Sequence, residues 1–230
     1  MEHIAIKEQM VDVCKKMWQL GWVAANDGNI SVRLPDGTFL ATPTGISKGM
    51  ITLDKIVHID SNAQLITPND QGLKPSSEIK MHLKCYVDRP DVNAVVHAHP
   101  PTATAYAVAN IHMDRYTIVE TIIAIGAIPV TPYGTPSTQE VPDAIEPYLQ
   151  EHDVLLLQNH GALTMGSDLL TAYYRMETLE LYAKISLNAH LLGGERELPR
   201  SDIDRLIGMR ENYKVTGKHP GFKRYREDNA

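Results

Sequence analysis

AVVHAHP, at residues 94–100, is an apolar run that ends in two histidines spaced two positions apart. Successive side chains of a β-strand alternate between its two faces, so positions i and i+2 point the same way. His97 and His99 are therefore predicted to project side by side from the end of a mostly buried strand. Two imidazoles in this arrangement are suited to binding one divalent metal ion, and the other motifs can be placed around them.

The composition is that of a globular protein. The chain has 230 residues, of which 43% are hydrophobic and 22% are charged, with a net charge of -6. This length suits one large domain, and we assign residues 1–230 to a single domain. The negative charge excludes a global basic field that could hold nucleic acid. Positive charge for a small anionic substrate would have to be local.

The cysteines and the hydropathy pattern do not indicate secretion or membrane insertion. Cys14 and Cys85 lie in helix-like contexts without CxxC spacing, which is typical of buried free thiols in a reducing compartment. The N-terminus lacks a basic segment followed by an apolar core, and no apolar run approaches the ~20 residues of a membrane span. We therefore expect a cytoplasmic protein with no membrane partner.

Helix and strand patterns alternate in the first half of the chain. They predict a helix at 4–20, a hairpin of strands at 30–34 and 38–41, and a strand at 56–60. Residues 74–78, KPSSE, are expected to open a helix that a hydroxyl residue caps. Ile79, Leu83 and Val87 would form the apolar stripe of this helix, and the strand at the histidine pair follows it.

The second half continues the alternation. The predicted elements are a small-residue helix at 103–109, an apolar segment at 118–125 that fits helix or strand, a helix at 138–150, strands at 154–158 and 162–165, and helices at 168–192 and 202–213. Residues 128–130 lead into a turn at 131–134. Interleaved strands and helices with an early hairpin predict a mixed α/β fold of the α+β type, in which helices flank one sheet.

A third histidine, His160, follows another apolar strand in the sequence Asn159-His160-Gly161. Imidazoles suit zinc and several other divalent metals, and catalytic zinc has three protein ligands and one open position. Structural zinc sites are usually closed by cysteines, and no cysteine lies near these histidines. We therefore expect a catalytic metal bound by three histidines. The alternative for His160 is that it only satisfies a turn.

Glu78 lies at the start of a predicted helix, beside two serines. A favourable interaction between its carboxylate and the helix dipole is enough to explain this position. A second interpretation makes it a fourth metal ligand or a general acid/base. Taken alone, the residue favours the first interpretation.

Three loops that precede the histidine pair are rich in backbone amides and hydroxyl groups. Their members are Asn29, Thr44, Gly45, Ser76 and Ser77. Such groups bind phosphate without the help of lysine or arginine. Each residue type is also common in ordinary turns and caps, so the loops suggest an anion site without establishing one.

Five motifs together carry a family resemblance. They are GNISVR at 28–33, TPTG at 42–45, PSSE at 75–78, VHAH at 96–99 and QNHG at 158–161. With them the chain resembles the class II aldolase/ribulose-phosphate 4-epimerase family, most of all the members that cleave L-fuculose 1-phosphate. The resemblance implies a central, mainly antiparallel sheet with helices on both sides. It also implies a homotetramer with active sites between subunits.

The resemblance also implies roles for individual residues. His97, His99 and His160 would hold zinc, with manganese or cobalt as other possibilities, and Glu78 would complete the metal sphere and act as the acid/base. Tyr213, in the last predicted helix, would reach a neighbouring subunit's site. The phosphate-binding residues implied are Asn26, Gly28, Asn29, Thr44, Gly45, Ser76 and Ser77.

The implied reaction is cleavage of a ketose 1-phosphate, such as L-fuculose 1-phosphate or 5-deoxyribulose 1-phosphate, to dihydroxyacetone phosphate and an aldehyde through a metal-stabilised enediolate. Glu120 stands where the fuculose-phosphate members carry tyrosine, and related methylthioribulose-phosphate dehydratases use a glutamate in this region as acid/base. The 4-epimerases carry aspartate where Glu78 stands. The dehydratases lack a residue equivalent to Glu78, so its presence favours aldol cleavage, with epimerisation and dehydration on the same metal site as the alternatives. A non-catalytic interaction module is a second one, although scaffold proteins of this fold lack the histidines.

Overall fold

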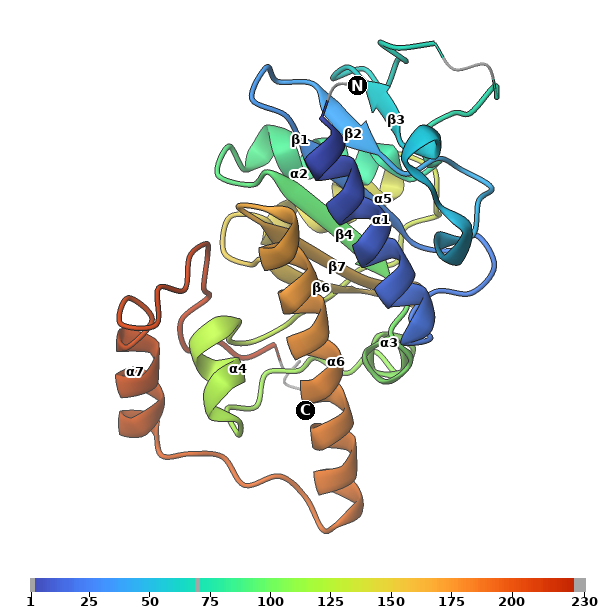
Figure 1. Cartoon of the computed structure of the whole chain (residues 1–230). Coiled ribbons are helices and arrows are strands. Elements are labelled where there is room, and N and C mark those ends of the chain that lie inside the picture. Colours follow the sequence, from blue (N-terminus) through green and yellow to red (C-terminus); the bar gives the residue numbers. More distant parts are fainter. Residues whose placement is uncertain (1–2, 69–70, 226–230) are drawn as a thin grey trace.

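The computed structural model describes residues 3–68 and 71–225 of the chain (Figure 1). The strands are β1 (Asn29–Arg33), β2 (Phe39–Ala41), β3 (Val57–Ile59), β4 (Ala94–Ala98), β5 (Val130–Thr131), β6 (Val154–Leu157) and β7 (Gly161–Gly166). The α-helices are α1 (Ile4–Gln19), α2 (Ile79–Asp88), α3 (Pro101–Val108), α4 (Val119–Ala124), α5 (Glu140–Ile145), α6 (Leu169–Leu191) and α7 (Arg200–Gly208). Short 3-10 helices occupy Lys48–Met50 (η1), Leu53–Lys55 (η2) and Glu146–Tyr148 (η3).

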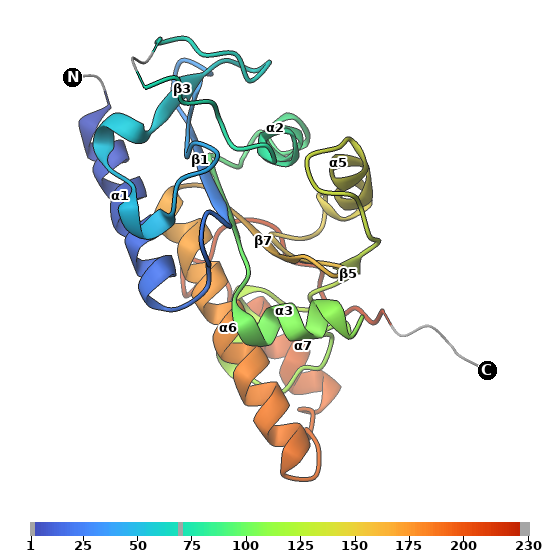
Figure 2. The same cartoon turned by 90° about the vertical axis from the view of Figure 1, so that its right-hand side faces the viewer.

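The strands of the described residues form one sheet in the order β3-β2-β1-β4-β7-β6-β5. All neighbours pair antiparallel except β5 and β6, which are parallel. Figure 2 shows that α1 and α6 cover one face of the sheet and that α2 and α5 cover the other. The expected fold class, a mainly antiparallel central sheet flanked by helices, is confirmed.

The central strand β4 explains why the two histidines share a face. Ala94, Val96 and Ala98 pack in the core that the sheet forms with α1, α3 and α6, whereas Val95 packs in the core on the side of α2 and α5. Because side chains alternate along a strand, His97 points to the same side as Val95, toward α2. Every position of β4 is buried. Each fully buried valine contributes about 1.5–3 kcal/mol of hydrophobic stabilisation, so the histidine stands on a rigid strand.

Helix α2 begins later than the sequence pattern predicts. Its first helical residue is Ile79, and the preceding N-cap residue, Glu78, makes no side-chain cap hydrogen bond. The predicted hydroxyl cap is therefore wrong. Ser76 instead accepts a hydrogen bond from the Glu78 backbone N–H at 3.3 Å, within the turn that leads into the helix.

The buried face of α2 also differs from the predicted apolar stripe, because Val87 is 75% exposed. His82 and Tyr86 lie on the buried face instead. Ser31 of β1 gives each of them one partner, because its Oγ lies 2.7 Å from His82 Nδ1 and 2.8 Å from the Tyr86 hydroxyl. A buried polar group is tolerated where it has a partner, and here the partner is 51 and 55 positions away in the sequence.

The last part of the chain forms a small additional core. The ambiguous segment at 118–125 is the helix α4, which lies beside α7 (Figure 1). Tyr116, Ile122 and Ile203 pack together between these elements. Helix α7 ends at Gly208, so Tyr213 lies in the turns that follow and not in the helix where it was expected.

The cysteines agree with their predicted state. Cys14 and Cys85 are both buried and unpaired, and they belong to the cores on opposite faces of the sheet. Within the described ranges, no helix combines the length and the apolar character that a membrane crossing requires.

Candidate metal centre

Three chain segments bring His97, His99 and His160 together at one end of the sheet. His97 is the fourth residue of β4 and pairs with Leu163 of β7, so the turn before β7 places His160 beside it. One ligating nitrogen from each of the three rings lies within 4.8 Å of the others. The Nε2 atoms of His97 and His99 are 3.2 Å apart. We call these three residues the histidine cluster.

The turn that carries His160 depends on both of its neighbours. Asn159 has a φ of 56°, in the left-handed region that asparagine tolerates better than most residues. A Cβ atom at Gly161 would lie 2.5 Å from His99 Cδ2 and 2.6 Å from the Ala98 carbonyl oxygen. Only glycine permits this approach of β7 to the end of β4. The Asn-His-Gly sequence is thus what allows the third imidazole to meet the first two.

The hydrogen bonds of His97 set its tautomer. Its Nδ1 lies 2.9 Å from the carbonyl oxygen of Ala162, and a carbonyl only accepts, so Nδ1 carries the proton. The lone pair of Nε2 therefore faces the cluster, as a metal ligand requires. Burial, with the neighbouring His97 as the next cause, lowers the pKa of His99 and of His160 to about 4. Both rings are therefore neutral near pH 7, the state in which imidazole binds metal.

Glu78 closes the remaining side of the cluster. Its Oε2 lies 3.3 Å from His97 Nε2, and its Oε1 lies 3.2 Å from His160 Nε2. The Asn29 side chain donates a hydrogen bond to Oε2 at 3.0 Å. Burial raises the pKa of Glu78, but the neighbouring His97, His160 and Asn29 outweigh it and hold this pKa well below its usual range. The carboxylate is ionised and turned to the histidines instead of capping α2.

The ligating nitrogens of the cluster and the Glu78 carboxylate converge at this point. Because His97 carries its proton on Nδ1, its Nε2 cannot donate to the Glu78 carboxylate. The lone pair of His97 Nε2 and the Glu78 Oε2 atom, 3.3 Å apart, repel each other unless a cation lies between them. Three neutral imidazoles and one carboxylate are a donor set that zinc, manganese or cobalt accepts. The cluster and Glu78 therefore form a group that could bind a divalent metal.

Two of the three predicted phosphate loops run side by side in front of α2. The backbone N–H of Thr44 donates to the Lys74 carbonyl at 3.0 Å, and that of Ser76 donates to the Thr42 carbonyl at 3.1 Å. Thr44, Gly45 and Ser77 are exposed and accessible to a ligand, whereas Ser76 is 9% exposed. The structure thus brings the second and third loops together, directly before Glu78.

The first loop joins this arrangement through Asn29. Asn29 begins β1 opposite His97, is 3% exposed, and leaves its Oδ1 atom without a described partner. Gly28 has a φ of 70°, and a Cβ there would lie 2.5 Å from Val23 Cγ1 and 3.0 Å from the His97 carbonyl oxygen. Asn26, at the start of this loop, is exposed. Glycine is required at position 28 because the loop passes directly over β4.

Glu120 and Tyr213 are not brought to the histidine cluster within one chain. Glu120 is exposed in the first turn of α4, and Tyr213 is 60% exposed beyond the end of α7. In Figure 1, α4 and α7 lie together at the lower left of the molecule, whereas α2 lies in its upper part. Among the residues that the structure describes, no hydrogen bond or ion pair connects either side chain to the cluster.

Two residues beside the site were missed from the sequence. His82 is buried one helical turn after Glu78, with its Nε2 unpartnered, and burial together with His97 lowers its pKa to about 3. Its i+4 spacing from Glu78 could have placed both on one helix face. Lys48 is only 1% exposed. No periodic pattern in the sequence marks this lysine as buried.

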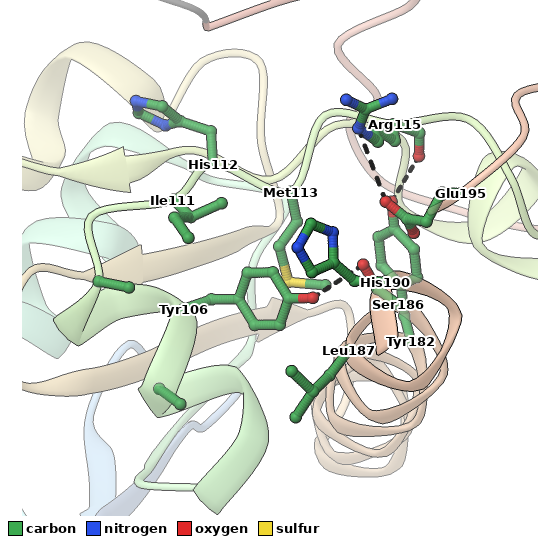
Figure 3. Close-up of a pocket in the computed structure, with 12 residues that line it drawn as sticks. Tyr106, Ile111, His112, Met113, Arg115, Tyr182, Ser186, Leu187, His190 and Glu195 are labelled. Atoms are coloured by element: carbon green, nitrogen blue, oxygen red, sulfur yellow. Dashed lines mark hydrogen bonds and ion pairs between the residues drawn. The ribbon is translucent and has the colours of Figure 1, made fainter. Parts of the chain in front are cut away.

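A cavity of about 370 Å³ lies elsewhere, between α3, the segment at 109–115 and the second half of α6. Figure 3 shows its lining, in which Ile111, Met113 and Leu187 accompany the hydroxyl of Tyr106, which donates to Ser186 at 2.9 Å. None of the three residues of the histidine cluster, and none of the loop residues predicted to bind phosphate, lines this cavity. The candidate site is therefore the exposed junction of loops above the sheet and not the enclosed cavity.

The fold and this cluster define a class of enzyme, a lyase of the aldolase type, and relatives that match the chain over most of its length are named aldolases. Residues 8–187 match the family described as the class II aldolase and adducin N-terminal domain, and the chain belongs to this family. The family resemblance found in the sequence motifs is thereby confirmed.

Several relatives extend over nearly the whole chain. The L-fuculose phosphate aldolase of Escherichia coli O6:H1 (strain CFT073) is 34% identical over 217 residues, which cover 94% of this chain and 98% of that protein. The 5-methylthioribulose-1-phosphate/5-deoxyribulose-1-phosphate aldolase of Escherichia coli O45:K1 (strain S88) is 34% identical over 188 residues, or 80% and 86% of the two chains. A solved L-fuculose 1-phosphate aldolase structure, 28% identical, matches with a TM-score of 0.83 over 93% and 98%. Equal identity to relatives with different substrates leaves the substrate unassigned.

Proposed function

We propose that the chain is a metal-dependent class II aldolase that cleaves a ketose 1-phosphate to dihydroxyacetone phosphate and an aldehyde. The observation that carries this proposal is the convergence of the histidine cluster on the Glu78 carboxylate, with contacts of 3.2 and 3.3 Å. The neighbouring amide-rich loops support a phosphorylated substrate. L-Fuculose 1-phosphate and 5-deoxyribulose 1-phosphate are the candidate substrates, since the relatives named above act on them.

In this proposal the cluster and Glu78 hold zinc, with manganese or cobalt as the alternatives. When bound, such a cation supplies Lewis-acid stabilisation of the negative charge that develops on substrate oxygens during carbon–carbon cleavage. The hydroxyls and backbone amides of the three loops hold the phosphate. The residues assigned to this role are Asn26, Gly28, Asn29, Thr44, Gly45, Ser76 and Ser77.

Glu78 is assigned as the acid/base of the reaction. Its carboxylate is ionised, 13% exposed and held by the Asn29 amide, so it can take a proton at the point where substrate oxygens would enter. It then returns a proton to the carbon that cleavage leaves on the dihydroxyacetone phosphate half. Proton exchange with the aldehyde half is assigned to Glu120 or Tyr213.

Glu120 and Tyr213 are exposed and distant from the cluster of their own chain, so the same proposal places them at a neighbouring subunit's site. A homotetramer with active sites between subunits would bring them there. Light scattering of the purified protein measures this directly, and a monomer would contradict the shared site. The two unpaired, buried cysteines support a reducing compartment, for which we propose the cytoplasm.

The Glu78→Gln variant tests the acid/base assignment. We expect it to retain bound metal, because an amide oxygen can still ligate, and to lose about 10²–10⁴-fold in turnover, because an amide cannot exchange the proton. Metal analysis and steady-state kinetics measure the two effects. Glu140→Gln is the matched control, since Glu140 also lies at a helix start but accepts its hydrogen bond from the Thr135 backbone N–H, at 2.8 Å, instead of facing a histidine. Full activity of Glu78→Gln would contradict the role.

A product assay separates the aldolase from its alternatives. Glu120 is the residue that favours dehydration of the methylthioribulose type, because a carboxylate there could serve as a second acid/base. The 4-epimerases share the motif set but carry aspartate where Glu78 stands. The protein is incubated with L-fuculose, 5-deoxyribulose, methylthioribulose and ribulose phosphates, with zinc and with manganese. Release of dihydroxyacetone phosphate supports aldol cleavage, whereas a product of unchanged carbon count rejects it. Absence of both bound metal and turnover would favour the interaction module.

A further inference from the structure

Lys48 is a buried cation without a carboxylate in contact. It begins η1, directly after the second phosphate loop, and it is 1% exposed. Arg89 is equally buried, but it pairs with Asp91 at 2.7 Å and with Asp153 at 2.6 Å. Across residues 3–68 and 71–225, no carboxylate lies within ion-pair distance of the Lys48 ammonium, whose described partners are two carbonyl oxygens.

The two hydrogen bonds of Lys48 connect two of the proposed phosphate loops. Its Nζ donates to the Asn26 carbonyl at 2.9 Å and to the Ile46 carbonyl at 3.1 Å. Asn26 opens the loop that leads to Asn29, and Ile46 follows Gly45. An ammonium group has three donors, so these contacts leave one N–H for a further acceptor. The lysine therefore ties the two loops together from the buried side.

The charges around Lys48 do not neutralise it by contact. Burial lowers the pKa of Lys48, and among its titratable neighbours Cys14 has the largest opposing effect. Burial raises the pKa of that thiol to about 12, so the thiol is uncharged near pH 7. Asp27 and Glu78 act on the lysine only through space. Burying a charge that has no opposite charge in contact costs roughly several kcal/mol, even after the protein relaxes. Binding of an anion beside Lys48 would offset this cost.

We propose that Lys48 supplies the countercharge for the substrate's phosphate group from the buried side of the two loops that bind it. The exposed faces of these loops offer backbone amides and hydroxyl groups, which carry no positive charge. The Lys48 ammonium lies on the buried side of the same loops, bonded to the Asn26 and Ile46 carbonyls. This inference rests on the phosphate site of the proposed function. It does not depend on the identity of the sugar or on carbon–carbon cleavage.

The first measurement is calorimetric binding of inorganic phosphate to the metal-loaded protein and to its Lys48→Met variant. We expect phosphate to bind about tenfold more weakly, or worse, without the buried charge. Lys55→Met is the matched control, because Lys55 also donates to a backbone carbonyl, that of Met50 at 2.8 Å, but does so at the surface. Any phosphate bound by the metal is common to all three proteins and does not change the comparison.

A second variant separates countercharge from simple cross-linking of the loops. Lys48→Gln keeps N–H donors but has no charge, so the proposal predicts the same loss of phosphate affinity as in Lys48→Met. If Lys48 only links the two loops by hydrogen bonds, Lys48→Gln should bind phosphate about as tightly as the wild type. The KM for the phosphorylated substrate should rise in both variants while kcat changes less. Unchanged phosphate affinity in both variants would overturn the proposal.

The melting temperature without phosphate gives an independent readout. Removal of an unpaired buried charge should leave the melting temperature unchanged or raise it, whereas loss of a structural tie should lower it. The stabilisation that added phosphate gives to the wild type should shrink in Lys48→Met. If no sugar phosphate is cleaved, the proposed function fails but these binding results still decide the role of Lys48.

Discussion

Two regions of the molecule bury histidines with equally low pKa values, yet they use them in opposite ways. In the histidine cluster, burial and His97 hold the pKa of His99 and His160 at about 4. In the C-terminal segment, residues 209–225, burial lowers the pKa of His219 to about 4 as well. His219 donates from Nε2 to the Ile122 carbonyl at 2.8 Å and accepts from the Gly221 N–H at 3.0 Å.

The difference lies in what the ring nitrogens face. Both nitrogens of His219 are satisfied by the backbone, so the ring is a cross-link with no further capacity. In the cluster, the Nε2 atoms of His97 and His99 are 3.2 Å apart, and Glu78 adds acceptors on the remaining side. A low pKa therefore reports burial in both regions. Only unshared lone pairs that converge on one point indicate a site for a cation.

Replacing one histidine in each region tests this comparison with the largest expected effect. His99→Ala should lower metal affinity and turnover by at least about a hundredfold, because loss of a direct ligand costs more than loss of an outer partner. His219→Ala should keep its metal but lose about 1–3 kcal/mol of unfolding free energy, because two backbone groups lose their partner. Metal analysis, kinetics and denaturant titration measure these quantities. Equal metal loss in both variants would refute the distinction.

A pair of glycine substitutions gives an intermediate effect. Gly28 and Gly217 both have positive φ values, 70° and 83°, and an added Cβ would collide with Val23 in the first case and with the Asp153 carboxylate in the second. Each alanine variant should lose about 2 kcal/mol of unfolding free energy through strain and collision.

Only Gly28→Ala should also reduce turnover, by about tenfold or more, because its Cβ would also press on the His97 carbonyl oxygen and small displacements of reacting groups are costly. Parallel denaturation and activity measurements on the two variants check this. A similar loss of activity in Gly217→Ala would mean that the C-terminal segment also shapes the site.

The pH dependence of stability gives the smallest expected effect. The pKa of His219 is about 4 in the folded protein and about 6.5 when unfolded, so the unfolded state binds more protons between these values. Its contribution to stability is complete above about pH 6.5 and is lost as the pH falls toward 4. The loss at pH 5.5 should be about 1 kcal/mol for this one histidine.

Comparing urea denaturation of the wild type and His219→Ala at pH 7.5 and pH 5.5 isolates this contribution. The variant should lose less unfolding free energy on acidification than the wild type. With metal bound, the wild type should respond more steeply, because protons also compete with the metal for the histidine cluster. An identical pH response of wild type and variant would show that His219 is not the group responsible.

Much of the framework follows from local rules that act over a few residues. The alternation of strand side chains was enough to place His97 and His99 on one face, and the Asn-His-Gly turn marked the third histidine. The order of the motifs predicted the family and the mainly antiparallel sheet. These features are readable because steric restriction of the backbone fixes the period of a strand or helix wherever it occurs.

The face of α2 that is buried could not be read from the sequence. The predicted apolar stripe through Val87 is wrong. Ser31, on a strand far away in the chain, forms hydrogen bonds with His82 and Tyr86, so these two polar side chains occupy the buried face of α2. The buried face of α2 and the late start of this helix together direct the Glu78 carboxylate toward the histidines. Its helix-start position alone had favoured a dipole interaction.

The sequence by itself determined which residues could bind a metal and which loops could bind phosphate. The tertiary structure decided which of them meet: Glu78 joins the cluster, whereas Tyr213 and Glu120 lie apart from it in this chain. It also decided that Lys48 is buried. The physical reason is that residue type and spacing fix the local direction of a side chain. Its burial, charge state and partners depend on groups that only the folded chain brings within a few ångströms.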